Sequence, residues 1–159
     1  MKNLAHEYTR MLDSKLFLSR NGYSPRLWGP SLWFAMTIIA SNYPLVPARA
    51  DEASYYRFFD NLRRVLPCKS CRAEYTKMIK KSENPELRLS RALFRQAVTE
   101  APGAARKRVF TWIVKIHNDV NKRLKKRRKT SVSFWAKTYA SLRLETNKVN
   151  ALRFPTGNL

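Results

Sequence analysis

Cysteine, glycine and acidic residues are all scarce in this sequence. Its 159 residues include two cysteines, four glycines and 11 acidic residues, against 32 Lys and Arg. Two cysteines exclude a disulfide-rich scaffold and cannot by themselves supply a four-thiolate zinc or iron–sulfur site. The low glycine content and the lack of alternating apolar segments argue against a β-sandwich or a barrel. The hydrophobic content of 44% is nevertheless enough for the packed core of one domain.

The sequence also lacks a long apolar run and a secretory leader. The longest uncharged stretch, residues 27–48, contains Pro30, Pro44 and Pro47. Its helical part would therefore be only about 20 Å long, too short for a bilayer core of about 30 Å. The first 15 residues mix charged and apolar side chains and contain no hydrophobic signal region. We expect no membrane insertion and a soluble, intracellular protein.

The excess of basic residues is the most pronounced feature of the composition. The formal net charge is +21 at pH 7, and seven of the eight residues in Lys122–Lys129 are Lys or Arg. Such a surface attracts polyanions, which leaves two non-enzymatic hypotheses open. The protein could bind nucleic acid, with Phe134 and Trp135 stacking on bases, or dock on acidic proteins as an interaction module. The run also fits a solvated helix end, where cations are favourable.

Apolar residues recur at helical spacing along the chain, and no strand is expected. Proline, glycine and asparagine separate the periodic segments and mark where helices end. The predicted fold class is all-α, most simply a helical bundle. Pro30 is expected to open one helix at its first position, and Asp51 is expected to cap another. The predicted helices cover residues 3–18, 31–43, 51–65, 68–81, 90–101, 106–126 and 133–144.

The segment Pro67-Cys68-Lys69-Ser70-Cys71 is the first that suggests chemistry. A Cys-x-x-Cys pair at a helix start brings two thiols close enough to bridge, and the helix N-terminus with Lys69 and Arg72 favours a thiolate. Cys71 shares a helical face with apolar residues. We therefore expect Cys71 to point inward and Cys68 to lie at the mouth, within reach of a substrate thiol. An outer and an inner cysteine fit a redox relay.

Three other interpretations of the cysteine pair stay open. A zinc site would need two more ligands, and the only histidines, His6 and His117, lack the spacing of a zinc finger. A thioredoxin-like fold would need a strand before the pair, where residues 58–66 have a helical pattern. Two buried core cysteines that happen to lie three residues apart would need no function.

A second group of polar residues lies in the most regular amphipathic segment. His117, Asn118 and Asn121 lie within about one helical turn of one another. Beside an aromatic-rich core these groups need hydrogen-bonding partners. A bound heteroaromatic ligand could supply them, and so could water or neighbouring protein groups. The aromatic residues expected beside them include Trp33, Tyr43 and Trp112.

These pieces, taken in order, resemble the Erv/ALR family of FAD-dependent sulfhydryl oxidases. The resemblance covers residues 28–126, and the order and spacing of its pieces make it specific. The motifs that carry it are Trp33 with Tyr43-Pro44, then Leu66-Pro67-Cys68-Lys69-Ser70-Cys71, then Trp112-x₄-His117-Asn118-x-Val120-Asn121-x-x-Leu124-x-Lys126.

The resemblance implies a four-helix bundle with a short fifth helix, FAD in the mouth of the bundle, and a homodimer. It implies that Cys68 exchanges with thiol-containing protein substrates and that Cys71 lies against the flavin and passes it two electrons. Dioxygen would reoxidise the flavin and give hydrogen peroxide. The domain would span residues 28–145, after a helical extension over residues 1–27 and before a basic tail over residues 146–159. The residues implied to bind FAD are Trp33, Tyr43, Trp112, His117, Asn118 and Asn121, with Lys126 near the pyrophosphate.

The sequence departs from the pattern of this family at several positions. Thr37 stands where members commonly have His, and Pro30 stands where Arg is common, so one flavin contact is expected to differ. Two cysteines leave none for the shuttle pair and structural disulfide of cellular members, so substrates would reach the active pair directly or through a separate relay protein. Minimal members of this kind resemble those of large DNA viruses, which implies a location in the host cytoplasm or the virion.

Overall fold

The structure, a computed structural model, describes residue 10, residues 21–126 and residues 131–141. These residues form helices and no named strand, which confirms the all-α prediction. The long helices are α2 (Pro25–Ser41), α3 (Arg49–Val65), α4 (Lys69–Lys81) and α5 (Ala104–Arg123). The shorter elements are the 3₁₀ turns η1 (Pro85–Leu87) and η2 (Arg91–Leu93) and the helix α6 (Val132–Ser141).

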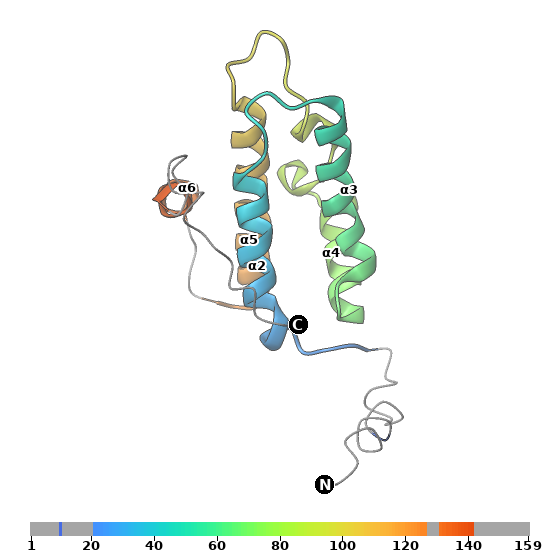
Figure 1. The fold of residues 1–159 in the computed structure, drawn as a ribbon. Helices are drawn as coiled ribbons and strands as arrows, with labels where there is room; N and C mark the ends of the chain where they lie inside the picture. Colours follow the sequence, from blue (N-terminus) through green and yellow to red (C-terminus); the bar gives the residue numbers. More distant parts are fainter. Residues whose placement is uncertain (1–9, 11–20, 127–130, 142–159) are drawn as a thin grey trace, which may run out of the picture.

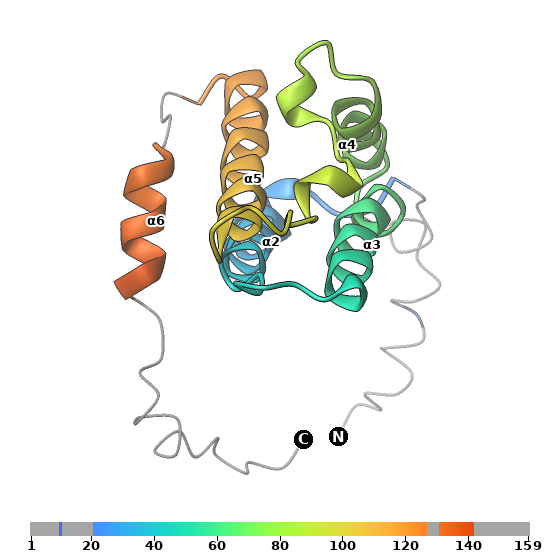
Figure 2. The same ribbon diagram turned by 90° about the horizontal axis from the view of Figure 1, so that it is seen from above.

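The four long helices form a bundle around one core. Helix α2 packs along α5, and α3 packs along α4, so that two helix pairs face each other (Figure 1). Helix α6 lies outside the bundle, against α5 and α2 (Figure 2). In the view of Figure 1 it is seen nearly along its own axis, and it therefore crosses the bundle helices. This arrangement is the four-helix bundle with a short additional helix that the sequence predicts.

Aromatic side chains fill the centre of the bundle. The Phe59 ring meets the Trp112 indole edge to face at 5.1 Å between centroids, and Tyr43 meets Tyr55 in the same way at 4.8 Å. Phe94, which lies between α4 and α5 in the sequence, is completely buried and contacts both Tyr43 and Phe59. Each such pair contributes about 0.5–1.5 kcal/mol beyond its burial. The aromatic cluster therefore fixes how the α2–α5 pair sits on the α3–α4 pair.

Helix α2 begins six residues earlier than predicted. Ser24 is its N-cap, with the hydroxyl accepting a hydrogen bond from the Arg26 amide, and Pro25 occupies the first helical position. This cap and proline provide the start that the prediction assigned to Pro30, which instead lies inside the helix. The expected domain boundary between residues 27 and 28 therefore falls within α2.

The starts of α3 and α4 are close to the predicted ones. Asp51 does cap α3, but from the third helical position, where its carboxylate accepts a hydrogen bond from the Ala48 amide at 2.9 Å. Helix α4 begins directly after Cys68, which is its N-cap. The predicted helices over residues 51–65 and 68–81 are therefore confirmed to within two residues.

The predicted helix over residues 90–101 is wrong. Only the short turn η2 forms there, and the apolar residue Val98 is fully exposed. The backbone is fixed by side chains instead: the Ala97 amide donates to Glu100, and the guanidinium of Arg108 donates to the Arg95 carbonyl and to Glu100. Burial of Phe94 together with these bonds outweighs a weak helical periodicity.

Several predictions concern residues outside the described part of the chain. These are the helix over residues 3–18, the last residues of the helix over residues 133–144, the tail over residues 146–159, and His6. Within the described part, no helix combines the length and the apolar character needed to cross a membrane.

Candidate functional site

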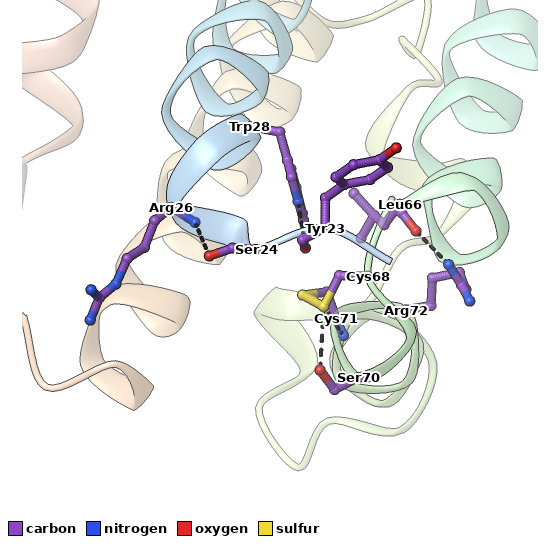
Figure 3. The surroundings of a disulfide bond; sticks show 9 residues. All are labelled: Tyr23, Ser24, Arg26, Trp28, Leu66, Cys68, Ser70, Cys71 and Arg72. Carbon is purple, nitrogen blue, oxygen red and sulfur yellow. Dashed lines mark hydrogen bonds between the residues drawn. A yellow bond between two sulfur atoms is a disulfide. The ribbon is translucent and has the colours of Figure 1, made fainter. Parts of the chain in front are cut away.

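The two cysteines form a disulfide at the N-terminus of α4. The Cys68 and Cys71 sulfurs are bonded at 2.15 Å, and the Cys71 amide donates a hydrogen bond to the Cys68 sulfur at 3.1 Å. The Ser70 hydroxyl lies 3.3 Å from the same sulfur (Figure 3). This geometry exists because the N-cap position leaves the first helical amides unpaired, and a sulfur placed there satisfies one of them. The predicted pairing of the two thiols is confirmed.

The competing interpretations of the pair find no support in the described residues. No group of three or more His, Cys, Asp and Glu side chains gathers there to hold a metal ion, His6 being outside them. The segment that leads into the pair is the helix α3 and not a strand, which excludes a thioredoxin-like fold. The cysteines are bonded to each other, so they are not two inert core thiols.

The relative exposure of the two cysteines is the reverse of the prediction. Cys68, expected at the mouth, is 6% exposed, whereas Cys71 is half-buried. Cys68 is covered because residues 21–23 cross over it and form an isolated antiparallel bridge between Gly22 and Cys68. Helical periodicity predicts that the two cysteines lie at the start of α4. It cannot predict that Gly22, 46 positions before Cys68, covers one of them.

A cavity of about 440 Å³ lies beside the disulfide, between α2, α4 and α5. Its walls are mostly apolar and aromatic and include Trp28, Trp33 and Met36 from α2 and Tyr75 from α4. Cys71 lines the same cavity. Volume and lining are typical of a site for an organic ligand. An electron carrier bound here would lie next to one sulfur of the disulfide.

Trp33 of α2 lines the cavity, and His117 of α5 stacks on it from behind. Their rings are stacked with centroids 4.5 Å apart and planes 15° from parallel. Burial lowers the pKa of His117, and the charge of Lys126 lowers it further. The imidazole is therefore neutral at pH 7, and it can present one donor and one acceptor to its surroundings. The structure brings these two predicted site residues together.

The remaining polar residues of the predicted site lie at the C-terminal end of α5. Asn121 is buried, and its carbonyl accepts a hydrogen bond from the Lys126 amide at 2.9 Å, while Lys126 itself lines the cavity. Asn118 is half-buried on the same helix. The hydrogen bond from the Lys126 amide to the Asn121 backbone carbonyl closes a tight turn at the end of α5. This turn places the Lys126 side chain at the rim of the cavity.

Arg123 is a cavity residue that the sequence analysis did not single out. Its guanidinium bonds Asp119 at 2.6 Å within α5 and Glu74 of α4 at 3.2 Å, and both Arg123 and Glu74 line the cavity. The ion pair therefore joins the two helices across the cavity rim. Arg123 lies three residues before Lys126, so the two side chains share one helical face. This spacing could have indicated a shared site, but Arg123 is also one of the many cations of the basic run, where no single residue stands out.

Two predicted flavin residues lie away from this cavity. Tyr43 is completely buried, and its hydroxyl donates to the Phe94 carbonyl at 2.7 Å. Trp112 is also buried, and its indole nitrogen donates to the Leu87 carbonyl at 3.1 Å. Both side chains have protein partners for their polar atoms and belong to the aromatic core. The structure does not bring them together with Trp33, His117 and Lys126.

The departures at positions 30 and 37 can also be located. Thr37 is buried in α2, donates to the Trp33 carbonyl at 2.7 Å and lies beside Tyr139 of α6. Pro30 is exposed on α2. Neither residue lines the cavity, and Thr37 instead contributes to the contact between α2 and α6.

Comparison with protein families and curated proteins gives consistent matches. The model of the Erv1 / Alr family matches residues 30–140. The probable FAD-linked sulfhydryl oxidase R368 of Acanthamoeba polyphaga mimivirus is 32% identical over 98 residues, 62% of this chain and 59% of that protein. The putative FAD-linked sulfhydryl oxidase 347L of Invertebrate iridescent virus 6 is 29% identical over 107 residues, 64% of this chain and 83% of its own. Mitochondrial FAD-linked sulfhydryl oxidase ERV1 of Saccharomyces cerevisiae is 24% identical over 111 residues, 70% and 49% of the two chains. The match thus spans about half to three fifths of the mimivirus and yeast proteins.

Solved structures share the fold. The yeast Erv1 core superposes with a TM-score of 0.56 at 24% identity, covering 81% of this chain and 94% of that one. The FAD-binding domain of Erv1 from Saccharomyces cerevisiae superposes with a TM-score of 0.57 at 24% identity, covering 75% and 96%. At this level of identity the likeness establishes a common architecture of the helices.

Proposed function

The chain belongs to the Erv1 / Alr family, and on this premise we propose that it is an FAD-dependent sulfhydryl oxidase that forms disulfide bonds in thiol-containing proteins. The observation that supports this most directly is the position of the Cys68–Cys71 disulfide, one sulfur of which lines a mostly apolar cavity with aromatic walls. A disulfide at a helix N-terminus is an acceptor of electrons from thiols. An organic electron carrier bound in the cavity beside Cys71 could then accept those electrons.

The exchange with substrate takes place on the two cysteine sulfurs. A substrate thiolate attacks the Cys68 sulfur, a new S–S bond forms, the Cys68–Cys71 bond breaks, and Cys71 leaves as a thiolate. A second substrate thiolate then attacks its own partner sulfur in the mixed disulfide and releases Cys68. The substrate passes two electrons to the cysteine pair, and its two thiol protons go to solvent. Amides at the start of α4, such as that of Cys71 beside the Cys68 sulfur, stabilise the thiolates that form.

The residues of the cavity fit FAD. Trp28 and Trp33 offer flat apolar surface to a ring system, and Arg123 and Lys126 place two cations at the rim, where a pyrophosphate needs them. Neutral His117 supports Trp33 from behind by ring stacking. When bound, FAD supplies two-electron chemistry that connects the reduced cysteine pair to dioxygen, with hydrogen peroxide as the product.

The proposal also includes the electron acceptor, the oligomeric state, the location and the role of the basic surface. Dioxygen as acceptor, a homodimer, and a location in the host cytoplasm or virion follow from likeness to the family and to its viral members. The basic surface is assigned to the attraction of acidic substrate proteins. The names of the relatives give no support to the nucleic-acid alternative.

An absorbance spectrum of the purified protein tests the proposal. We expect a yellow protein whose flavin absorbance bleaches with dithiothreitol without air and returns when air is admitted. Cys71→Ser should keep FAD bound but lose the bleaching, because Cys68 alone cannot form the electron-accepting disulfide and the cavity is no longer lined by a cysteine sulfur. A folded, colourless protein that takes up no added FAD would overturn the assignment, and bleaching at the wild-type rate in Cys71→Ser would overturn the role of that cysteine.

A further inference from the structure

A three-residue segment, Asn21-Gly22-Tyr23, crosses directly over the disulfide, and we call it the strap. The Tyr23 amide donates to the Pro67 carbonyl at 2.6 Å, and the Lys69 amide donates to the Asn21 carbonyl at 3.0 Å. Gly22 and Cys68 are thereby paired as in an antiparallel sheet. The strap thus engages the backbone on both sides of Cys68, and Figure 3 shows Tyr23 beside the disulfide.

Gly22 is required for this close approach. Its φ of +81° lies in the left-handed region, and a Cβ atom added to it would lie 2.4 Å from the Pro67 carbonyl oxygen. No side chain tolerates that contact, and the oxygen belongs to backbone that cannot swing away. Even alanine at position 22 would therefore displace the strap from Cys68.

The strap is held by backbone bonds and by little buried surface. The Trp28 indole donates to the Tyr23 carbonyl at 3.1 Å and ties the strap to α2. The Tyr23 side chain is 57% exposed, and Asn21 and Gly22 are exposed as well. Release therefore costs mainly hydrogen bonds, which water or another peptide can replace, and only the partial burial of Tyr23.

The strap closes the approach that the exchange chemistry needs. Nucleophilic attack requires access to the Cys68 sulfur, yet Cys68 is almost fully buried. When the strap leaves, the Pro67 carbonyl and the Lys69 amide lose their partners. An acceptor and a donor two residues apart on one edge are what an extended peptide backbone pairs with.

We propose that the strap occupies the place of the substrate: an extended segment of a dithiol protein displaces residues 21–23 and pairs antiparallel with Pro67–Lys69, which delivers its cysteine to Cys68. This inference deepens the proposed function and rests on it for the identity of the substrate class. The exchange itself is the one written above, in which the substrate passes two electrons to the disulfide and its two thiol protons to solvent. Recognition through backbone atoms accepts many sequences, provided that the segment around the cysteine is extended.

The first test displaces the strap. In the full-length protein, the reduction of Cys68–Cys71 by glutathione is followed by alkylation of the released thiols and mass measurement. Gly22→Ala and Gly22→Val should speed this reaction about tenfold, because one or two hydrogen bonds no longer hold the strap. Gly103→Ala is the matched control, since Gly103 also has a positive φ of +87° but contacts Leu45. Wild-type rates in both Gly22 variants would overturn the gating role.

The second test uses the wild-type protein, so it does not depend on the variants folding. A short extended peptide with a cysteine pair is compared with its analogue that is N-methylated beside the first cysteine. Loss of the donor to Pro67 should slow reduction of the disulfide about tenfold, whereas equal rates would refute the backbone pairing. Both tests read the protein sulfurs and need no FAD. If the oxidase assignment is wrong, the protein will lack flavin absorbance, but its disulfide will still exchange with thiols as described here.

Discussion

Replacement of Tyr43 by phenylalanine separates a core role from a cofactor role at this position. The change removes one hydroxyl and leaves the ring in place among Tyr55 and Phe94. The Phe94 carbonyl then loses the buried hydrogen bond of 2.7 Å that it accepts from Tyr43. A buried acceptor left without its donor costs about 1–3 kcal/mol, which in a chain of this size lowers the Tm by about 2–12 °C.

The assay combines unfolding with FAD titration. We expect Tyr43→Phe to unfold at lower urea concentration with an unchanged slope and to bind FAD with wild-type affinity, because Tyr43 does not line the cavity. Tyr55→Phe is the matched control, since Tyr55 lies against Tyr43 at a half-buried position and should change stability by less than about 0.5 kcal/mol. A Tyr43→Phe protein of normal stability but weakened FAD binding would refute this reasoning and return Tyr43 to the cofactor site.

Three further substitutions test other features. Trp33→Ala should weaken FAD binding about tenfold in a fluorescence titration, whereas Phe34→Ala, an exposed aromatic change on the same helix, should leave it unchanged; equal effects would remove Trp33 from the site. Phe94→Ala should cost about 3–5 kcal/mol in urea unfolding, and exposed Val98→Ala less than about 0.5 kcal/mol; comparable costs would restore a packed helix over residues 90–101. Because the pKa of His117 is lowered in the folded protein, protonation favours the unfolded chain, so the free energy of unfolding should fall as the pH drops below about 6.5. His117→Gln should flatten this dependence in thermal melts between pH 7.5 and 5.5, and an unaltered slope would contradict the lowered pKa.

The helices and the disulfide could be predicted from the sequence because both depend on local patterns. Cys68 and Cys71 are three residues apart at a helix start, and a pair so spaced is brought together by the helix itself. Likewise the apolar periodicity of α5 marks its buried face, on which Val109, Ile113 and Ile116 lie. Local signals of this kind need no knowledge of the tertiary structure.

The features that the sequence did not reveal depend on contacts between distant residues. The burial of Cys68 results from the strap, and the role of Arg123 at the cavity results from its ion pair with Glu74, 49 positions away. The irregular segment around Phe94 is held by Arg108 across 13 positions. The periodicity of a short stretch of sequence carries no information on a partner that lies outside that stretch. Local patterns alone therefore cannot predict these three features.

The small size of the Cys68–Cys71 loop has a consequence for the proposed oxidase cycle. A disulfide stabilises a fold mainly by restricting the unfolded chain, and the restriction grows with the number of residues enclosed. Here the cysteines are only three positions apart, so the chain-entropy contribution is about 2 kcal/mol, against nearly 5 kcal/mol for a loop of about 100 residues. The bundle is held instead by the ring contacts of its aromatic core, in which neither cysteine takes part. Under the proposed function, the protein would therefore alternate between oxidised and reduced forms at every turnover as one folded scaffold, and the stability of the fold would depend little on the redox state of Cys68 and Cys71.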